Sequence, residues 1–177
     1  VPLFMIVSAF LLVPMKEGQN MWQFYRHRFM RILPPFLIFM VLYSTLPMLW
    51  GQIDSATSVK DLSRIWLNFP TLAGHLWFMY PLISLYLFIP IVSPWISKAS
   101  AKEERFFIVL FLVSTCMPYL NRVAGEVWGQ CFWNEYHMLW YFSGYLGYLV
   151  LAHYIRVHLT WSRSKRLWGG GLLMVIG

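Results

Sequence analysis

The chain contains 177 residues, of which 59% are hydrophobic and only 12% are charged. Soluble domains are about 45–50% apolar and about 25% charged, so this composition excludes an ordinary soluble globular protein. The formal net charge of +7 does not indicate nucleic-acid binding, because the basic residues are dispersed among apolar runs and form no basic face. The two cysteines provide neither a disulfide framework nor a metal-binding spacing. We therefore expect an all-α, polytopic integral-membrane helical bundle.

Six apolar runs are candidate transmembrane helices, since a span needs about 20 mostly apolar residues. In chain order they cover residues 1–15, 32–51, 74–95, 106–120, 137–155 and 168–177. The runs are long and lack a period of two, which favours helices over strands. Because the first and last runs are cut within apolar sequence, we expect one membrane-embedded domain over 1–177 that is incomplete at both ends. The short run 106–120 is expected to extend to Glu104 or Asn121.

The charges of the connections predict the orientation of the chain. Loops 16–31, 96–105 and 156–167 hold 11 of the 14 Lys and Arg residues, and the two other connections hold three. Basic residues near the ends of spans favour the cytoplasmic side. These three loops are therefore predicted to be cytoplasmic, which places the starts of the runs 74–95 and 137–155 at the outer face.

Three stretches carry a resemblance to a known family. They are "VPLFMIVSAFLL", "FYRHRFMRILPPFLIF" and the "HLWF" that begins at His75, and their order and sidedness agree with the predicted topology. Together they resemble the acyltransferase 3 family of integral-membrane acyltransferases, which modify extracytoplasmic sugars. A looser match, "LWYFSGYLGYLVLAHYI", extends the likeness to about Tyr154. The chain departs from the family's Ser-Gly in its second helix, where Ser8 and Ala9 stand instead.

The resemblance implies O-acyl transfer, with acyl-CoA (acetyl-CoA) as a cytoplasmic donor substrate and a hydroxyl of a cell-surface or lipid-linked sugar as acceptor. It implies no bound cofactor or metal, and a location in a bacterial plasma (inner) membrane among lipids. The family carries an Arg and a His, the usual candidate base, in a helix that would precede Val1. On this expectation the chain alone is inactive.

Arg28 and Arg31 are the predicted acyl-CoA-binding residues. They stand at i and i+3 on one helical face at the cytoplasmic boundary, where two guanidinium groups suit the phosphates of coenzyme A. The alternative is a lipid-headgroup anchor that needs no substrate. Arg26 is expected on the solvated face, and Pro34 and Pro35 are expected near the start of the span.

His75 is the predicted auxiliary catalytic residue, because a neutral imidazole at the outer face can exchange a proton with an acceptor hydroxyl. Trp77 and Tyr80 are the predicted acceptor-binding residues, with ring faces on which a sugar can stack. His75 and Trp77 do not share a face of a regular α-helix, so a joint site requires an irregular helix start or a partner helix that bridges the two residues. The alternative for all three is an aromatic belt at the membrane interface.

We expect structural rather than catalytic roles for four further residues. Ser143 and Gly147 form a small-xxx-small pair suited to close helix contact, Cys116 is expected in the core, and His153 is expected at the interface.

The alternative function is that of a polysaccharide exporter or transporter without catalysis. The absence of Asp, Glu, Lys and Arg in the middle of the six runs argues against ion-coupled transport.

Overall fold

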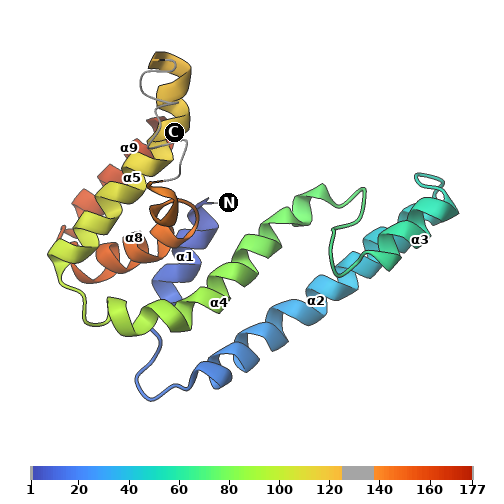
Figure 1. Ribbon diagram of the computed structural model, residues 1–177, viewed down its shortest axis with the longest axis horizontal. Coiled ribbons are helices and arrows are strands. Elements are labelled where there is room, and N and C mark those ends of the chain that lie inside the picture. The colour runs from blue at the N-terminus through green and yellow to red at the C-terminus, as the bar shows by residue number, and fades with distance from the viewer. Residues whose placement is uncertain (1, 125–137, 177) are drawn as a thin grey trace. The chain divides into compact units, whose positions relative to one another are not determined.

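The computed structural model describes residues 2–124 and 138–176, and within these ranges the chain is all-α with no strand. This confirms the all-α part of the predicted fold class. The α-helices are α1 (Pro2–Leu12), α2 (Met21–Leu49), α3 (Ser55–Ser63), α4 (Met79–Ile96), α5 (Ala101–Ala124), α8 (Leu146–Val157) and α9 (Arg163–Ile176) (Figure 1). Two short 3-10 helices, Gly74–Phe78 and Trp140–Phe142, precede α4 and α8.

Helix α2 begins 11 residues before the predicted run 32–51. The side chain of Asn20 caps it by accepting a hydrogen bond from the backbone N–H of Trp22 at 3.1 Å. The basic stretch that was expected to be a loop is therefore its first three turns. Pro34 and Pro35 lie in the helix interior, which corrects their expected place near its start. Such prolines remove backbone donors, and membrane helices tolerate them where neighbouring groups compensate.

The chain divides into two compact units, and the first comprises Pro14–Trp95. In this unit α2 and α4 run antiparallel (Figure 1). Two hydrogen bonds define their register at one end: the Met15 N–H donates to Ser93 Oγ at 3.0 Å, and the Tyr25 hydroxyl donates to the Leu87 carbonyl at 2.8 Å. Two ring contacts define it toward the other end. The ring centroids of Phe36 and Tyr80 lie 6.1 Å apart, and those of Tyr43 and His75 lie 5.0 Å apart. The start of α2 therefore lies beside the end of α4, as the alternating topology requires.

The connection from α2 to α4 is held by side-chain hydrogen bonds. Asp54 caps α3 by accepting from the N–H of Thr57, and Asp61 accepts from both the N–H and the hydroxyl of Thr71 at 2.9 and 3.0 Å. The buried Ser58 hydroxyl donates to the Ser44 carbonyl of α2 at 2.7 Å. These bonds tie the segment before His75 to the C-terminal half of α2.

The second unit comprises Pro2–Val13 and residues 96–177 and is built around α8, which packs on both α1 and α5. Gly147 faces Phe111 so closely that a Cβ there would collide with the ring, which confirms the predicted close contact at Gly147. Ser143 does not share that helix, because it ends the preceding 3-10 turn in an extended conformation. Arg156 donates to the carbonyls of Phe10 and Val13 at 3.0 and 3.2 Å and so satisfies the end of α1.

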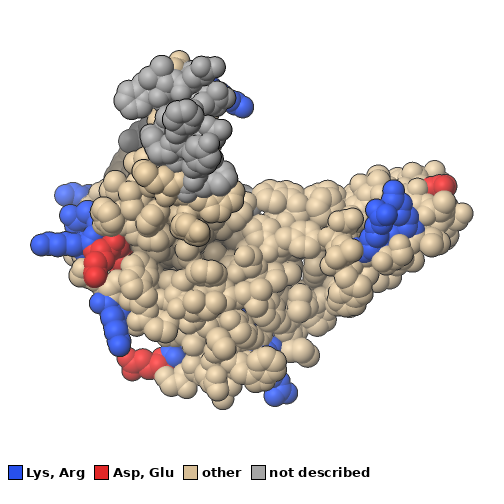
Figure 2. Space-filling view, in the orientation of Figure 1, with Lys and Arg blue, Asp and Glu red and all other residues tan. Residues whose placement is uncertain are grey.

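Two helical stretches are long and apolar enough to cross a membrane, Met21–Leu49 and Gly74–Ile96. Leu3–Leu12 and Leu146–Val157 are apolar but shorter. Helix α5 extends in both directions beyond the run 106–120, as expected, whereas α8 starts at Leu146 and not at the predicted residue 137. Figure 2 shows uncharged residues over most of the described surface, with the charged residues in a few separate places. Only 22% of the apolar window in α2 is buried. Such apolar exposure fits a lipid environment. Six spans remain a prediction.

Candidate functional site at the two ends of the α2–α4 pair

Arg28 and Arg31 lie in the N-terminal half of α2. The helix is continuous through both residues, so they occupy neighbouring positions on its surface. Arg28 is partly buried, and its guanidinium carbon lies 5.8 Å from the centroid of the Phe24 ring. This cation–π contact restricts Arg28 while its donors stay available. Arg31 is exposed. The prolines that follow leave the Met30 and Arg31 carbonyls without their helical N–H partners.

His75 lies at the opposite end of the pair, in the 3-10 helix Gly74–Phe78. The chain before α4 is therefore not α-helical, as a joint site of His75 and Trp77 required, but in a 3-10 helix residues i and i+3 share a face, so the two side chains still point in different directions. The His75 ring is exposed and meets the Tyr43 ring edge-to-face at 5.0 Å. Tyr43 belongs to α2, so this contact links the candidate base to the helix that carries the two arginines.

Trp77 and Tyr80 differ in how much ring surface they offer. Trp77 is 43% exposed and can stack on a ligand. The Tyr80 ring instead lies against Phe36 and Phe69, at 6.1 and 6.2 Å between centroids, beside a core that includes Leu76. Its buried hydroxyl has no hydrogen-bond partner among the described residues. Neither the packed ring nor the buried hydroxyl of Tyr80 is therefore open to a ligand in this structure.

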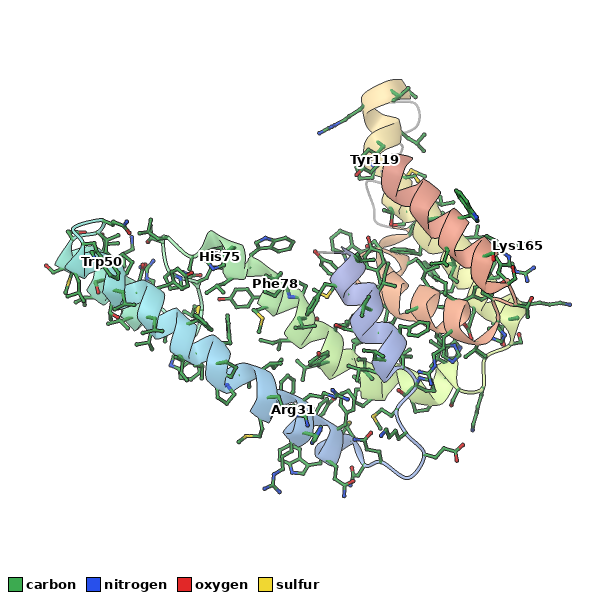
Figure 3. The ribbon with its side chains drawn as sticks, turned by 180° about the vertical axis from the view of Figure 1, so that it is seen from behind. Arg31, Trp50, His75, Phe78, Tyr119 and Lys165 are labelled. Carbon is green, nitrogen blue, oxygen red and sulfur yellow. The ribbon has the colours of Figure 1, made fainter. Side chains whose placement is uncertain are left out.

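Arg31 and His75 lie far apart along the α2–α4 pair and do not meet (Figure 3). Tyr43, the contact of His75, follows Arg31 by 12 residues on one continuous helix, a rise of about 18 Å at about 1.5 Å per residue. This separation is smaller than the roughly 30 Å thickness of a bilayer core. One helix thus connects a basic end with an imidazole and aromatic end.

The second unit contains a cavity of about 610 Å³ between α5 and the segment that precedes α8. Hydroxyl groups of Ser114 and Thr115, the rings of Tyr145 and Tyr148, and Arg122 contribute to its wall. Aromatic faces combined with hydroxyl and guanidinium donors suit a polyhydroxylated ligand. Sequence analysis missed this site, because its residues come from segments more than 20 positions apart.

Sequence analysis also missed a buried polar cluster in the second unit. Glu104 is completely buried, and its Oε1 lies 2.9 Å from His153 Nδ1 and 3.2 Å from His158 Nε2. His153 was expected at the interface, but it is buried because Glu104 provides a hydrogen-bonding partner. His158 contacts the same carboxylate oxygen. No periodic pattern could have indicated contacts across 49 and 54 residues.

One further sequence prediction has a structural outcome. Cys116 is exposed on α5, so its expected place in the core is wrong. In a membrane helix the face directed at lipid is as apolar as the core, which is why composition alone did not distinguish them. Glu126, Cys131, Glu135 and His137 lie outside the described residues.

Comparison with known proteins identifies the family of the chain. A model of the acyltransferase domain, named for the acyltransferase 3 family, matches residues 1–177, the whole chain. Searches of the curated proteins and of the solved structures found no match. The match agrees with the three sequence stretches and with an all-helical structure that has long apolar helices. The chain therefore belongs to the acyltransferase 3 family, and its function is that of an acyltransferase.

Proposed function

We propose that the protein is a membrane O-acyltransferase that moves an acyl group, acetyl in the simplest case, from cytoplasmic acyl-CoA to a hydroxyl of a cell-surface or lipid-linked sugar. The observation that carries the proposal is the single helix α2. It bears Arg28 and Arg31 in its N-terminal half and contacts His75 through Tyr43 near its other end. A donor with anionic phosphates and an acceptor outside the membrane require such an arrangement.

The donor end is assigned to Arg28 and Arg31. Two guanidinium groups one helical turn apart can bind phosphate oxygens through several charge-assisted hydrogen bonds. The contact of Arg28 with Phe24 lowers the entropy lost when a ligand binds, since the side chain is already restricted. Lipid phosphates satisfy the same chemistry, so a test must separate an anchor from a substrate contact.

The acceptor end is assigned to His75 and Trp77, with Tyr80 as a further acceptor-binding residue that would have to turn its buried hydroxyl toward the sugar. The sugar oxygen attacks the thioester carbonyl carbon, so a C–O bond forms and the C–S bond breaks. The principal base takes the hydroxyl proton, and coenzyme A leaves as a thiolate that accepts a proton in turn. His75 assists by orienting the attacking hydroxyl, and the principal base is proposed to lie on a helix upstream of this sequence.

The donor assignment is tested with the full chain that the gene encodes, reconstituted in lipid vesicles. We expect Arg28→Ala and Arg31→Ala each to raise the KM for acetyl-CoA about tenfold or more, because each removes a charge-assisted contact of about 1.5–3 kcal/mol. Arg26→Ala is the matched control, since Arg26 is an exposed residue of the same helix. Equal KM values in all three variants and the wild type would show that the pair only anchors lipid.

A polysaccharide exporter is the second candidate function. The buried Glu104 with its histidines is an ionisable group of the kind that proton-coupled carriers use, and this observation favours transport. The two functions differ in their products. Glycan that gains label from acetyl-CoA identifies the enzyme, whereas unlabelled glycan that still crosses the membrane identifies the exporter.

A further inference from the structure

Glu104, His153 and His158 form a cluster that has no role in the proposed acyl transfer. Glu104 stands in the first turn of α5, His153 lies within α8, and His158 ends that helix. We propose that these three side chains form a binding site for one divalent transition-metal ion of the zinc class. The ion would join the start of α5 to the end of α8.

The ligand set is the first argument. Imidazole nitrogens together with one carboxylate oxygen suit zinc and its neighbours, whereas magnesium and calcium favour oxygen ligands alone. Two histidines with one glutamate also form a known zinc site, with a fourth position left for water. The donor set therefore selects the class of metal.

The geometry is the second argument. One ligand atom from each residue lies within 4.8 Å of the two others. The contacts of Glu104 Oε1 with the two imidazole nitrogens, 2.9 and 3.2 Å, are near the separation of about 3.3 Å between neighbouring ligands in a tetrahedral site with bonds of about 2.0–2.1 Å. Small rotations of the side chains would bring all three atoms to bonding distance of one ion.

The electrostatic state of Glu104 is the third argument. The residue has no solvent exposure, and its second oxygen, Oε2, has no hydrogen-bond partner among the described residues. A buried carboxylate oxygen without a partner is costly, because water no longer solvates its charge. A divalent cation bound between the three side chains would compensate this charge directly.

The two neighbouring arginines, Arg105 and Arg156, bind other groups and do not occupy the cluster. Arg105 directs its guanidinium to the Tyr154 hydroxyl at 3.2 Å, and Arg156 is engaged by the carbonyls at the end of α1. His158 is partly exposed, with 23% of its side chain accessible, which provides a path for the ion. The alternative is a pair of protonated histidines that neutralise Glu104 without metal, and it makes different predictions.

The test is metal analysis of the full chain purified in nanodiscs without an affinity tag that contains histidine. After treatment with a chelator and addition of ZnCl₂, we expect about one zinc per chain by mass spectrometry. We expect at least a tenfold lower occupancy in Glu104→Gln and in His158→Asn. His27→Asn, which alters an exposed histidine of α2, should retain the wild-type occupancy.

The two cluster variants guard against misfolding in different ways. Glu104→Gln changes a fully buried group, whereas His158→Asn changes a partly exposed residue at a helix end, which is expected to fold. Addition of ZnCl₂ should also raise the melting temperature of the wild type and not that of His158→Asn, because an ion that binds only the folded state stabilises it. Cobalt in the wild type should give the intense visible absorption of a four-coordinate site.

Two results would overturn the proposal. The first is less than a tenth of an equivalent of zinc in the folded wild type, with no change in melting temperature when ZnCl₂ is added. The second is an equal zinc content in the wild type and in His158→Asn. Either result would identify the cluster as a metal-free ion pair between Glu104 and protonated histidines.

Discussion

His75 in the first unit and His153 in the second are both histidines near the start or the end of an apolar helix, yet their environments are opposite. His75 is exposed and meets the ring of Tyr43, whereas His153 is buried and paired with the carboxylate of Glu104. A ring that water or a ligand can reach is suited to proton exchange with a substrate. A ring held by a buried carboxylate is suited to fixing helices or binding a cation. Environment, and not residue type, separates the two roles.

The largest expected effect tests how tightly the second unit is packed. Gly147→Ala would place a methyl group in the Phe111 ring, and such overpacking costs about 1–3 kcal/mol of unfolding free energy. We therefore expect a melting temperature several degrees lower for this variant, measured by intrinsic fluorescence in detergent. Gly74→Ala in the first unit is the control, because nothing lies within 4 Å of an added Cβ there. Equal melting temperatures would contradict the tight contact of α5 and α8.

The next prediction concerns the exposed histidine. His75→Asn should lower the rate of acyl transfer about tenfold, which corresponds to about 1.4 kcal/mol, and should leave the KM for acetyl-CoA unchanged. The loss is smaller than for a principal base, because His75 only assists. His27→Asn, in the basic end of α2, should have the wild-type rate. A wild-type rate in His75→Asn would reduce His75 to a residue of the aromatic belt.

A smaller effect is expected at the acceptor surface. Trp77→Ala should raise the KM for the sugar acceptor about fivefold, since an aromatic contact contributes about 0.5–1.5 kcal/mol. Trp66→Ala is the control, because this ring is 78% exposed in the connection between α3 and α4. If both variants behaved alike, the acceptor would have to bind elsewhere, and the cavity beside Arg122 would be the first place to examine.

The smallest effect concerns the start of α5. Ser100 and Glu103 form a capping box, in which the Ser100 N–H donates to Glu103 Oε2 at 2.7 Å. The backbone and side-chain hydrogen bonds from Ser100 lower the pKa of Glu103 below its ordinary value of 4.5. A lowered folded-state pKa contributes stability that is present above the unfolded value and is lost as the pH falls through the folded one.

The wild type and Glu103→Ala should therefore differ in melting temperature at pH 6 and converge as the pH falls through the lowered pKa of Glu103. Glu17→Ala, at an exposed residue before α2, controls for the general effect of acid on the protein. A difference between wild type and Glu103→Ala that stayed constant down to pH 3 would show that the capping carboxylate does not contribute through its charge.

The sequence allowed the family and the helical class to be predicted, because both depend on local patterns. The stretches that contain Arg28, Arg31 and His75 are contiguous, and the family match confirms the likeness that they carry. Helix bounds were less accurate. Polar residues before Arg31 suggested a loop, but the Asn20 cap starts the helix there and solvated charges do not interrupt it.

The buried cluster shows the limit of such prediction. Glu104 stands in a charged segment that favours a solvated position, and its histidine partners follow 49 and 54 residues later. Only the packing of α8 on α5 brings them together. Gly147 was recognised beforehand because a small residue in an apolar helix has a local meaning, whereas a buried carboxylate depends wholly on its tertiary neighbours.

The central claim is that the donor binds at the cytoplasmic end of α2 and the acceptor is modified at the other end. Its most direct test uses inside-out and right-side-out membrane vesicles that contain the full chain and its native glycan. Labelled acetyl-CoA, which does not cross the bilayer, is added to the outside of each. We predict labelled glycan only in inside-out vesicles, with the label facing the vesicle lumen. Label transferred in right-side-out vesicles, or in neither preparation, would contradict the account.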